Sequence, residues 1–283
     1  MEQEKTAKGG RALHHRERVF RMPDVTGFEV SYYFRVDERE YGAYNFPPHM
    51  HDALEIYVLL EGDVSFTVEH NLYHLQAGDA IITKPNEIHN CILNAQGAHK
   101  HLCLWFSVAC EPLLKDFLQH DFGKDNLICP SSEDKKHLLS LYEKLRVSSE
   151  KDGKRYEFSL FLQILETLGK SLSCAVAPQQ MPAELQVILS DINDNFLSIK
   201  SLSYFTEKHF ISQSTLNRLF RTYLHTTPGL YLEAKRLAHS RLLLKKGKSV
   251  LAACMESGFS EPSNYIRLFK KRFGITPGQY RES

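Results

Sequence analysis

Two stretches in the last third of the chain decide the fold: ISQSTLNRLFRTYLHTTPGLY at residues 211–231 and SEPSNYIRLFKKRFGITPGQY at residues 260–280. Each residue of the first stretch lies 49 positions before its counterpart in the second. Identical pairs in and beside these stretches include Phe210 with Phe259, Arg218 with Arg267, Phe220 with Phe269, Thr227 with Thr276, Pro228 with Pro277 and Tyr231 with Tyr280. A match at one fixed offset indicates an internal repeat.

Each copy of the repeat has the pattern of a helix-turn-helix unit. Apolar residues recur at helical spacing in four segments, two in each copy. These segments are residues 202–209, 213–223, 250–257 and 261–273. In the second copy Gly258 supplies the left-handed residue that ends the first helix, and Ser260 is expected to cap the next. A helix over residues 230–244, about 22 Å long, joins the copies, so the two units can enter successive major grooves, which repeat about every 34 Å.

The second helix of each unit has an apolar face and a polar face. Leu216 and Phe220 in one helix, and Tyr265 and Phe269 in the other, fall at core-facing spacing. The polar residues left outside are of the kind that bind DNA, and several can read base edges. They are Ser214, Asn217, Arg218 and Arg221 in the first copy, and Ser263, Asn264, Arg267, Lys270 and Lys271 in the second. Positive charge suited to DNA phosphates comes from Lys245, Lys246, Lys248, Lys270 and Arg272.

Charge is distributed unevenly along the 283 residues. From Met181 onward there are 15 Lys and Arg against 8 Asp and Glu, whereas the rest of the chain is acidic. Any surface that binds a polyanion therefore belongs to the C-terminal part. Neither a membrane span nor a secretory segment is apparent, and the six cysteines lack the spacing of a zinc finger. We expect a cytoplasmic, nucleoid-associated protein that does not bind a membrane.

The stretch ESGFSEPSNYIRLFKKRFGITPGQYR at residues 256–281 resembles the DNA-binding domain of the AraC/XylS family of bacterial transcription regulators. The resemblance runs over residues 185–281. It implies that the protein is not an enzyme and that it activates or represses genes in response to a small effector, often a carbohydrate. The implied partners are double-stranded promoter DNA, the effector, a second copy of the chain and RNA polymerase. Pro262 departs from the pattern, because it removes a backbone donor near the start of the second recognition helix.

The first half of the chain has β character and is followed by helices. Short alternating runs between residues 28 and 106 predict an antiparallel sandwich or barrel. Residues 156–173 carry apolar side chains at three- and four-residue steps, which suits either self-association into a dimer or packing on the barrel of the same chain. The predicted fold class is α+β, with an effector-binding barrel (1–125), a helical dimerisation and linker region (126–180) and an all-α DNA-binding domain (181–283).

Polar residues within the predicted barrel resemble the two cupin motifs. His49, His51 and Glu55 belong to the first motif and His89 to the second, although Glu87 stands where that motif has glycine. The first three share one parity, so they can face one interior together with His89. Tyr57 has the same parity, and we expect these five residues to form the effector site. Phe66 and Trp105 are candidate apolar walls.

The chemistry of this cluster leaves alternatives open. Three imidazoles and a carboxylate suit a divalent transition metal held by His49, His51, Glu55 and His89. The same groups can line a small-molecule pocket or serve as hydrogen-bonded interior residues. Since sensor domains of the resembled family need no metal, we expect no required cofactor. The competing hypothesis is a metal-dependent cupin enzyme with an appended helical domain.

Overall fold

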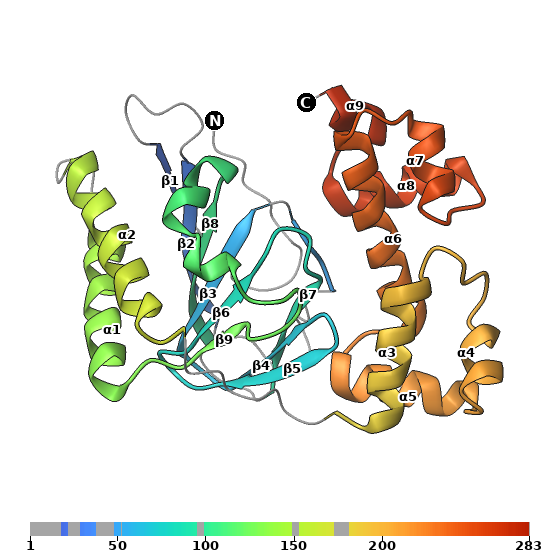
Figure 1. The fold of residues 1–283 in the computed structure, drawn as a ribbon, viewed down its shortest axis with the longest axis horizontal. Coiled ribbons are helices and arrows are strands. Elements are labelled where there is room, and N and C mark those ends of the chain that lie inside the picture. Colours follow the sequence, from blue (N-terminus) through green and yellow to red (C-terminus); the bar gives the residue numbers. More distant parts are fainter. Residues whose placement is uncertain are drawn as a thin grey trace.

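The computed structural model describes residues 18–21, 29–37, 48–51, 53–94, 99–148, 153–172 and 181–282. Figure 1 shows two parts. We call the part that runs from β1 to α2 the N-terminal domain, and the part that runs from α3 to α9 the helical domain. Among the residues that the structure describes, none of the helices combines the length and apolar character needed to cross a membrane.

The N-terminal domain is built on two antiparallel sheets. The strands are β1 (Arg18–Arg21), β2 (Glu29–Asp37), β3 (Leu54–Glu61), β4 (Val64–Val68), β5 (Asn71–Leu75), β6 (Ala80–Thr83), β7 (His89–Leu93), β8 (His99–Phe106) and β9 (Leu127–Ile128). The larger sheet has the order β1-β2-β8-β3-β6-β9, and the smaller has the order β5-β4-β7. The described strands therefore form two sheets and not the closed barrel that we expected, because β4 takes both of its neighbours, β5 and β7, from the smaller sheet.

Helices cover the larger sheet of the N-terminal domain. Two short 3₁₀ segments, Val108–Leu113 and Asp116–Leu118, precede α1 (Ser132–Val147) and α2 (Lys154–Gly169). The apolar seam of α2 packs into the core of its own chain, where Phe161 and Leu168 are almost completely buried with Ile56 and Leu104 of the sheet. Of the two alternatives for this seam, the structure shows packing within one chain. A dimer would have to use another surface.

The helical domain contains the two repeat copies. Its helices are α3 (Ala183–Asn195), α4 (Ser203–Lys208), α5 (Gln213–Leu224), α6 (Pro228–Lys245), α7 (Val250–Glu256), α8 (Pro262–Phe273) and α9 (Pro277–Glu282). We call α4 and α5 the first unit, and α7 and α8 the second unit. Ser212 and Thr227 cap α5 and α6 through their hydroxyl groups. The expected cap at Ser260 is wrong: Pro262 occupies the first position of α8, so Glu261 is the capping residue and forms no side-chain cap bond.

The left-handed residue of the turn lies one position later in the first unit than in the second. In the second unit Gly258 takes a left-handed φ of 82° and Phe259 is buried. In the first unit the left-handed residue is Phe210, with φ 52°, and its ring is 93% exposed. His209, which aligns with Gly258, is held at the end of α4 by Asp191, whose Oδ2 lies 2.8 Å from His209 Nε2. The side chain that follows, Ile211, packs against the core in place of Phe210.

The two domains are in contact along one side of the smaller sheet (Figure 1). Leu72 and Ile92 of this sheet belong to the same buried cluster as Leu216 and Phe220 of α5. A buried ion pair crosses the boundary, since Lys235 Nζ of α6 lies 2.9 Å from Glu69 Oε2. The N-terminal domain therefore shares a core with the first unit.

Candidate nucleic-acid interface and histidine cluster

The second helix of each unit buries one face and exposes the other. Leu216 and Phe220 of α5, and Tyr265 and Phe269 of α8, have no measurable exposure. The residues that we predicted to contact DNA lie outside these cores, and all are exposed except Asn217, which is half-buried. They are Ser214, Asn217, Arg218 and Arg221 on α5, and Ser263, Asn264, Arg267, Lys270 and Lys271 on α8. The arrangement presents hydrogen-bonding and cationic side chains to solvent on two helices of one domain.

Two residues on the exposed face of α8, Asn264 and Arg267, are hydrogen-bonded to each other. The guanidinium of Arg267 donates a hydrogen bond to Asn264 Oδ1 at 2.7 Å, one helical turn away. This bond orients the planar guanidinium on the surface of the helix, where bidentate contact with a guanine edge is geometrically suited to it. Pro262 lies in the first turn of α8, where its missing N–H would have no partner within the helix.

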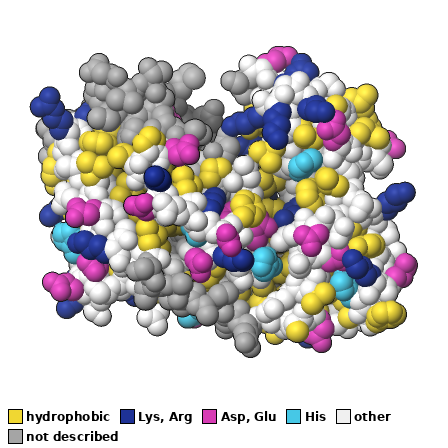
Figure 2. Space-filling model, viewed as in Figure 1, with side chains coloured by type: hydrophobic (Ala, Val, Ile, Leu, Met, Phe, Trp, Pro, Cys, Tyr) yellow, Lys and Arg dark blue, Asp and Glu magenta, His cyan; other side chains and the backbone are white. Residues whose placement is uncertain are grey.

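The cations suggested for phosphate contact do not share one environment. Lys245, Lys246, Lys248 and Lys270 are exposed. Arg272 is half-buried, and its guanidinium donates to the backbone carbonyl of Pro48 in the N-terminal domain. Figure 2 shows Lys and Arg side chains gathered in the upper part of the cleft between the two halves of the molecule. Arg272 therefore faces the N-terminal domain and not the outer surface of α8.

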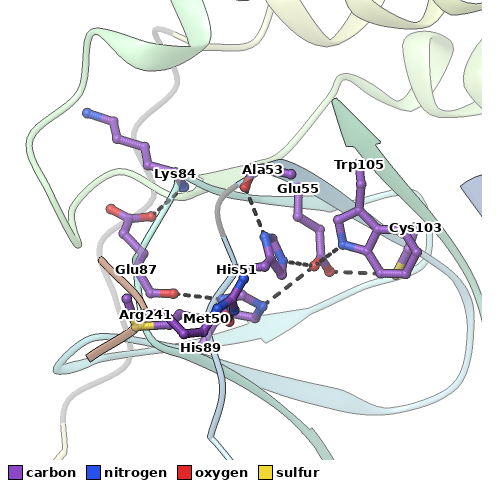
Figure 3. Close-up of polar contacts among 10 residues, drawn as sticks. All are labelled: Met50, His51, Ala53, Glu55, Lys84, Glu87, His89, Cys103, Trp105 and Arg241. Carbon is purple, nitrogen blue, oxygen red and sulfur yellow. Dashed lines mark hydrogen bonds and ion pairs between the residues drawn. The ribbon is translucent and has the colours of Figure 1, made fainter. Parts of the chain in front are cut away.

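The structure brings the predicted cluster of His49, His51, Glu55 and His89 together. Figure 3 shows His51 and His89 beside the carboxylate of Glu55. Backbone hydrogen bonds pair His49 with His89 as an isolated bridge, and their ring centroids lie 4.3 Å apart. His51 Nε2 lies 2.6 Å from Glu55 Oε2, and His89 Nε2 lies 3.5 Å from the same oxygen. One buried carboxylate thus faces the histidines.

The hydrogen bonds fix which ring nitrogens point at Glu55. Nδ1 of His51 lies 2.9 Å from the carbonyl of Ala53, and Nδ1 of His89 lies 2.9 Å from the carbonyl of Glu87, so each Nδ1 carries a hydrogen and donates it. The Nε2 atoms are left to face the carboxylate. A proton or another cation must lie between His51 Nε2 and Glu55, because two acceptors cannot approach to 2.6 Å without one.

The charges of this cluster follow from burial and neighbours. Burial alone would raise the pKa of Glu55, but the hydrogen bond with His51 and the nearby imidazole of His89, 3.5 Å away, outweigh it and hold the pKa well below its usual value. Burial, and next the nearby His89, lowers the pKa of His49 well below its usual value. At neutral pH the cluster therefore contains an ionised carboxylate and a neutral imidazole.

These residues fit a divalent cation. Ligand atoms of His49, Glu55 and His89 all lie within 4.8 Å of one another. In the part of the chain that the structure describes, the buried Nε2 of His89 makes no hydrogen bond. Metal-binding histidines commonly donate their other N–H to a backbone carbonyl, as His51 and His89 do.

Tyr57 lies further along β3 than the cluster. Its hydroxyl lies 2.7 Å from His99 Nε2, and its ring stacks on His101 at 4.8 Å. The prediction from sequence missed these two histidines, both of which are buried. The signal was present, because His99, His101, Cys103 and Trp105 alternate along one strand. Trp105 is more than the apolar wall that we expected, since its indole N–H donates to Glu55 Oε2 at 2.7 Å.

Glu87 holds a neighbouring loop and carries a pH-dependent charge. Its carboxylate accepts hydrogen bonds from Gly123 N, Lys84 N and Asn126 Nδ2. Burial raises the pKa of Glu87 to about 6 from an ordinary value of 4.5. The folded protein thus binds the proton more tightly than the unfolded chain does.

This raised pKa predicts a loss of stability as pH increases. As the pH rises from below 4.5 to above 6, the stabilisation due to Glu87 should fall by about 2 kcal/mol in all, since one pKa unit corresponds to about 1.4 kcal/mol. The measurement is the free energy of unfolding in urea of the wild type and of Glu87→Gln, each at pH 4.5 and pH 7. The wild-type value minus the variant value should be smaller at pH 7. A difference that is constant or grows with pH would contradict the assignment.

Known proteins resemble both domains. Residues 31–160 match the family of AraC-like ligand binding domains, and residues 206–283 match a helix-turn-helix domain family. The HTH-type transcriptional activator RhaR of Mannheimia succiniciproducens is 25% identical over 260 residues, which cover 86% of this chain and 90% of the relative. The virulence regulon transcriptional activator VirF of Yersinia enterocolitica is 26% identical over 256 residues, 82% of this chain and 90% of the relative.

A solved structure is also similar over most of the chain. ToxT from Vibrio cholerae O395 aligns with 91% of this chain and 98% of its own, at 13% identity and a TM-score of 0.37. That likeness is too low to transfer any residue.

The relatives are named as transcriptional activators and not as enzymes, and both predicted domain types are matched in the predicted order. The competing hypothesis of a cupin enzyme is therefore set aside. With an AraC-like ligand-binding domain followed by a helix-turn-helix domain, this chain belongs to the AraC family of transcription regulators.

Proposed function

We propose that the protein binds a specific sequence in double-stranded promoter DNA through α5 and α8, and that a small effector bound near His49 and His89 changes this binding. The observation that carries the proposal is the pair of helices with buried apolar faces and exposed Arg, Asn and Ser side chains. Direct readout requires such side chains to reach the base edges in the major groove. The names of the relatives favour activation, with RNA polymerase as the partner.

Arg218 and Arg267 are proposed to read bases. Replacing either with alanine should cost about 1–3 kcal/mol on the specific site and much less on random DNA, because a base contact contributes only where the correct base is present. The measurement is a fluorescence-anisotropy titration of the full-length protein on a duplex selected from random sequence by the wild type. Glu256→Ala, an exposed change on α7, is the control.

Two results would contradict this assignment. Equal losses on specific and random DNA would make the two arginines phosphate contacts. Failure of the wild type to select any sequence would remove the proposed function altogether.

The effector site is proposed to comprise His49, His51, Glu55, Tyr57 and His89. Its buried donors and acceptors suit a small polar molecule, and a carbohydrate is the class that the family resemblance favours. No cofactor is required by this proposal.

A divalent transition metal is the second candidate for this site, and the arrangement of His49, Glu55 and His89 favours it. Calorimetric titration of the metal-free protein with Zn²⁺ should then show one site per chain. His89→Ala should weaken binding by more than about tenfold, whereas the exposed His137→Ala should leave it unchanged. Equal affinities for wild type and His89→Ala would exclude a metal at this cluster.

Several further assignments belong to the same proposal. We infer a homodimer, which would use a surface other than the buried seam of α2. We retain the division into residues 1–125, 126–180 and 181–283. Because the proposed partner is chromosomal DNA, we place the protein in the cytoplasm, associated with the nucleoid.

A further inference from the structure

The N-terminal domain contacts both helix-turn-helix units, and it does so at separate places. Towards the first unit, Asn90 Nδ2 of β7 donates to the carbonyl of Leu224 at the end of α5, at 3.2 Å. The hydroxyl of Tyr231 donates to the carbonyl of Glu69 at 3.1 Å. Together with the shared apolar core, these contacts attach the smaller sheet and the turn after β4 to the first unit and the start of α6.

The second unit is contacted through two arginines. Arg241 of α6 donates from Nη1 to the carbonyl of Met50 at 3.1 Å, and Figure 3 shows these two residues beside the histidine cluster. The same guanidinium lies 4.8 Å from the ring centroid of Phe273 and 5.2 Å from that of Tyr280. Arg272 of α8 donates to the carbonyl of Pro48. The end of the second recognition helix is therefore held against the segment Pro48–Met50.

The position of Arg272 around α8 separates it from the proposed DNA-reading face. Successive residues of an α-helix are rotated by about 100°, which places Arg272 about 140° from Arg267 and about 100° from Lys271. Arg267 and Lys271 lie within about 40° of each other, and both are exposed. Burial against the N-terminal domain lowers the pKa of Arg272, consistent with a guanidinium that faces protein.

The two attachments meet at His49 and His89. The carbonyls that accept from Arg241 and Arg272 belong to the residues on either side of His49. The backbone of His49 pairs with that of His89 at 3.0 and 2.8 Å, and the residue after His89 is Asn90, which contacts the first unit. One short pair of segments therefore connects the histidine cluster to both units.

We propose that Arg241 and Arg272 are positioning residues that anchor the second unit to the N-terminal domain. By doing so they set the position of α8 relative to α5. That position selects the spacing between the two halves of the DNA site. The proposal rests on DNA binding through α5 and α8. A ligand bound in the cluster that moved His49 relative to His89 would shift the contacts to both units. If it bound more tightly to one arrangement of the two units than to the other, effector binding and DNA binding would be coupled.

The test asks whether Arg272 positions α8 or contacts a DNA phosphate. It uses the full-length protein and duplexes of two spacings. One duplex carries the site that the wild type selects from random sequence. The other has one base pair inserted between its halves, which rotates the second half by about 34°. The wild type should discriminate between them by at least the cost of a mismatched pair, about 5- to 150-fold. Arg272→Met should reduce this ratio by about fivefold or more, with an unchanged salt dependence.

A matched control is the exposed neighbour Lys271. As a phosphate contact, Lys271→Ala should reduce the slope of log affinity against log salt by about 0.9 and leave the spacing ratio unchanged. If Arg272→Met reduces the slope in the same way, or leaves the ratio unaltered, the positioning role is wrong. Arg241→Met, which keeps an apolar stem beside Phe273, is an independent second variant that should also lower the ratio. Absence of any selected site for the wild type would instead defeat the proposed function.

Discussion

Phe269→Ala is expected to lower the free energy of unfolding by about 3–5 kcal/mol, the usual cost of removing a buried phenylalanine ring. Phe269 has no measurable exposure and is surrounded by aromatic rings. Its centroid lies 5.7 Å from Tyr265, 4.6 Å from Phe273 and 5.7 Å from Tyr280. The cavity would lie in the centre of the second unit, so specific DNA binding should weaken with it. Urea denaturation followed by circular dichroism measures the change.

Ile266→Ala is the control on the same helix. Ile266 is 38% exposed and has a smaller side chain than Phe269, so its replacement should cost much less stability than Phe269→Ala, about 1 kcal/mol or less. A loss below about 1 kcal/mol for Phe269→Ala would show that the second unit does not depend on this core.

Glu69→Ala is expected to cost about 3–5 kcal/mol, because it leaves the Lys235 ammonium buried without its carboxylate. The two side chains are only 4% and 10% exposed, and they join the N-terminal domain to α6. Glu69 also accepts a hydrogen bond from Ile88 N at 2.8 Å. The loss should appear in urea unfolding, together with faster proteolysis between the domains.

Two comparisons separate charge burial from general damage. The ion pair of Lys248 and Glu256 has a similar distance of 2.9 Å but is 49% and 44% exposed, so Glu256→Ala should cost less than about 1 kcal/mol. Adding Lys235→Met to Glu69→Ala should restore part of the stability, because it removes the unpaired charge. Equal losses for the single and double variants would show that the buried ammonium is not the cause.

Much of the helical domain could be predicted because its signals are local. The apolar spacing in α5 and α8, the Thr-Pro pair that begins α6 and the glycine that ends α7 act within a few residues. Where two local signals competed, at the start of α8, proline outweighed the expected serine cap. The exposed faces of α5 and α8 follow directly from which positions the cores occupy.

The histidine cluster could be predicted from the sequence for a similar reason. Strand parity predicted that His51 and Glu55 lie on one side of the chain. The structure brings them to 2.6 Å, although β3 begins at Leu54 and His51 precedes it. The role of Trp105 as a hydrogen-bond donor to Glu55 could not be predicted, because it depends on the register between β3 and β8. Register is set by pairing between distant segments and leaves little trace in either strand alone.

The sequence by itself determined the paired helix-turn-helix units, the polar faces of α5 and α8, and the alternation that places Glu55 and Tyr57 on one face of β3. These properties depend on 3.6- and 2-residue periods and on capping residues, which operate over short distances along the chain. Only the tertiary structure decided that two sheets form in place of a closed barrel, that the α2 seam is buried within its own chain, and that Arg272 faces Pro48. Each of these depends on contacts between residues far apart in sequence, where one apolar or cationic side chain can satisfy several different partners equally well.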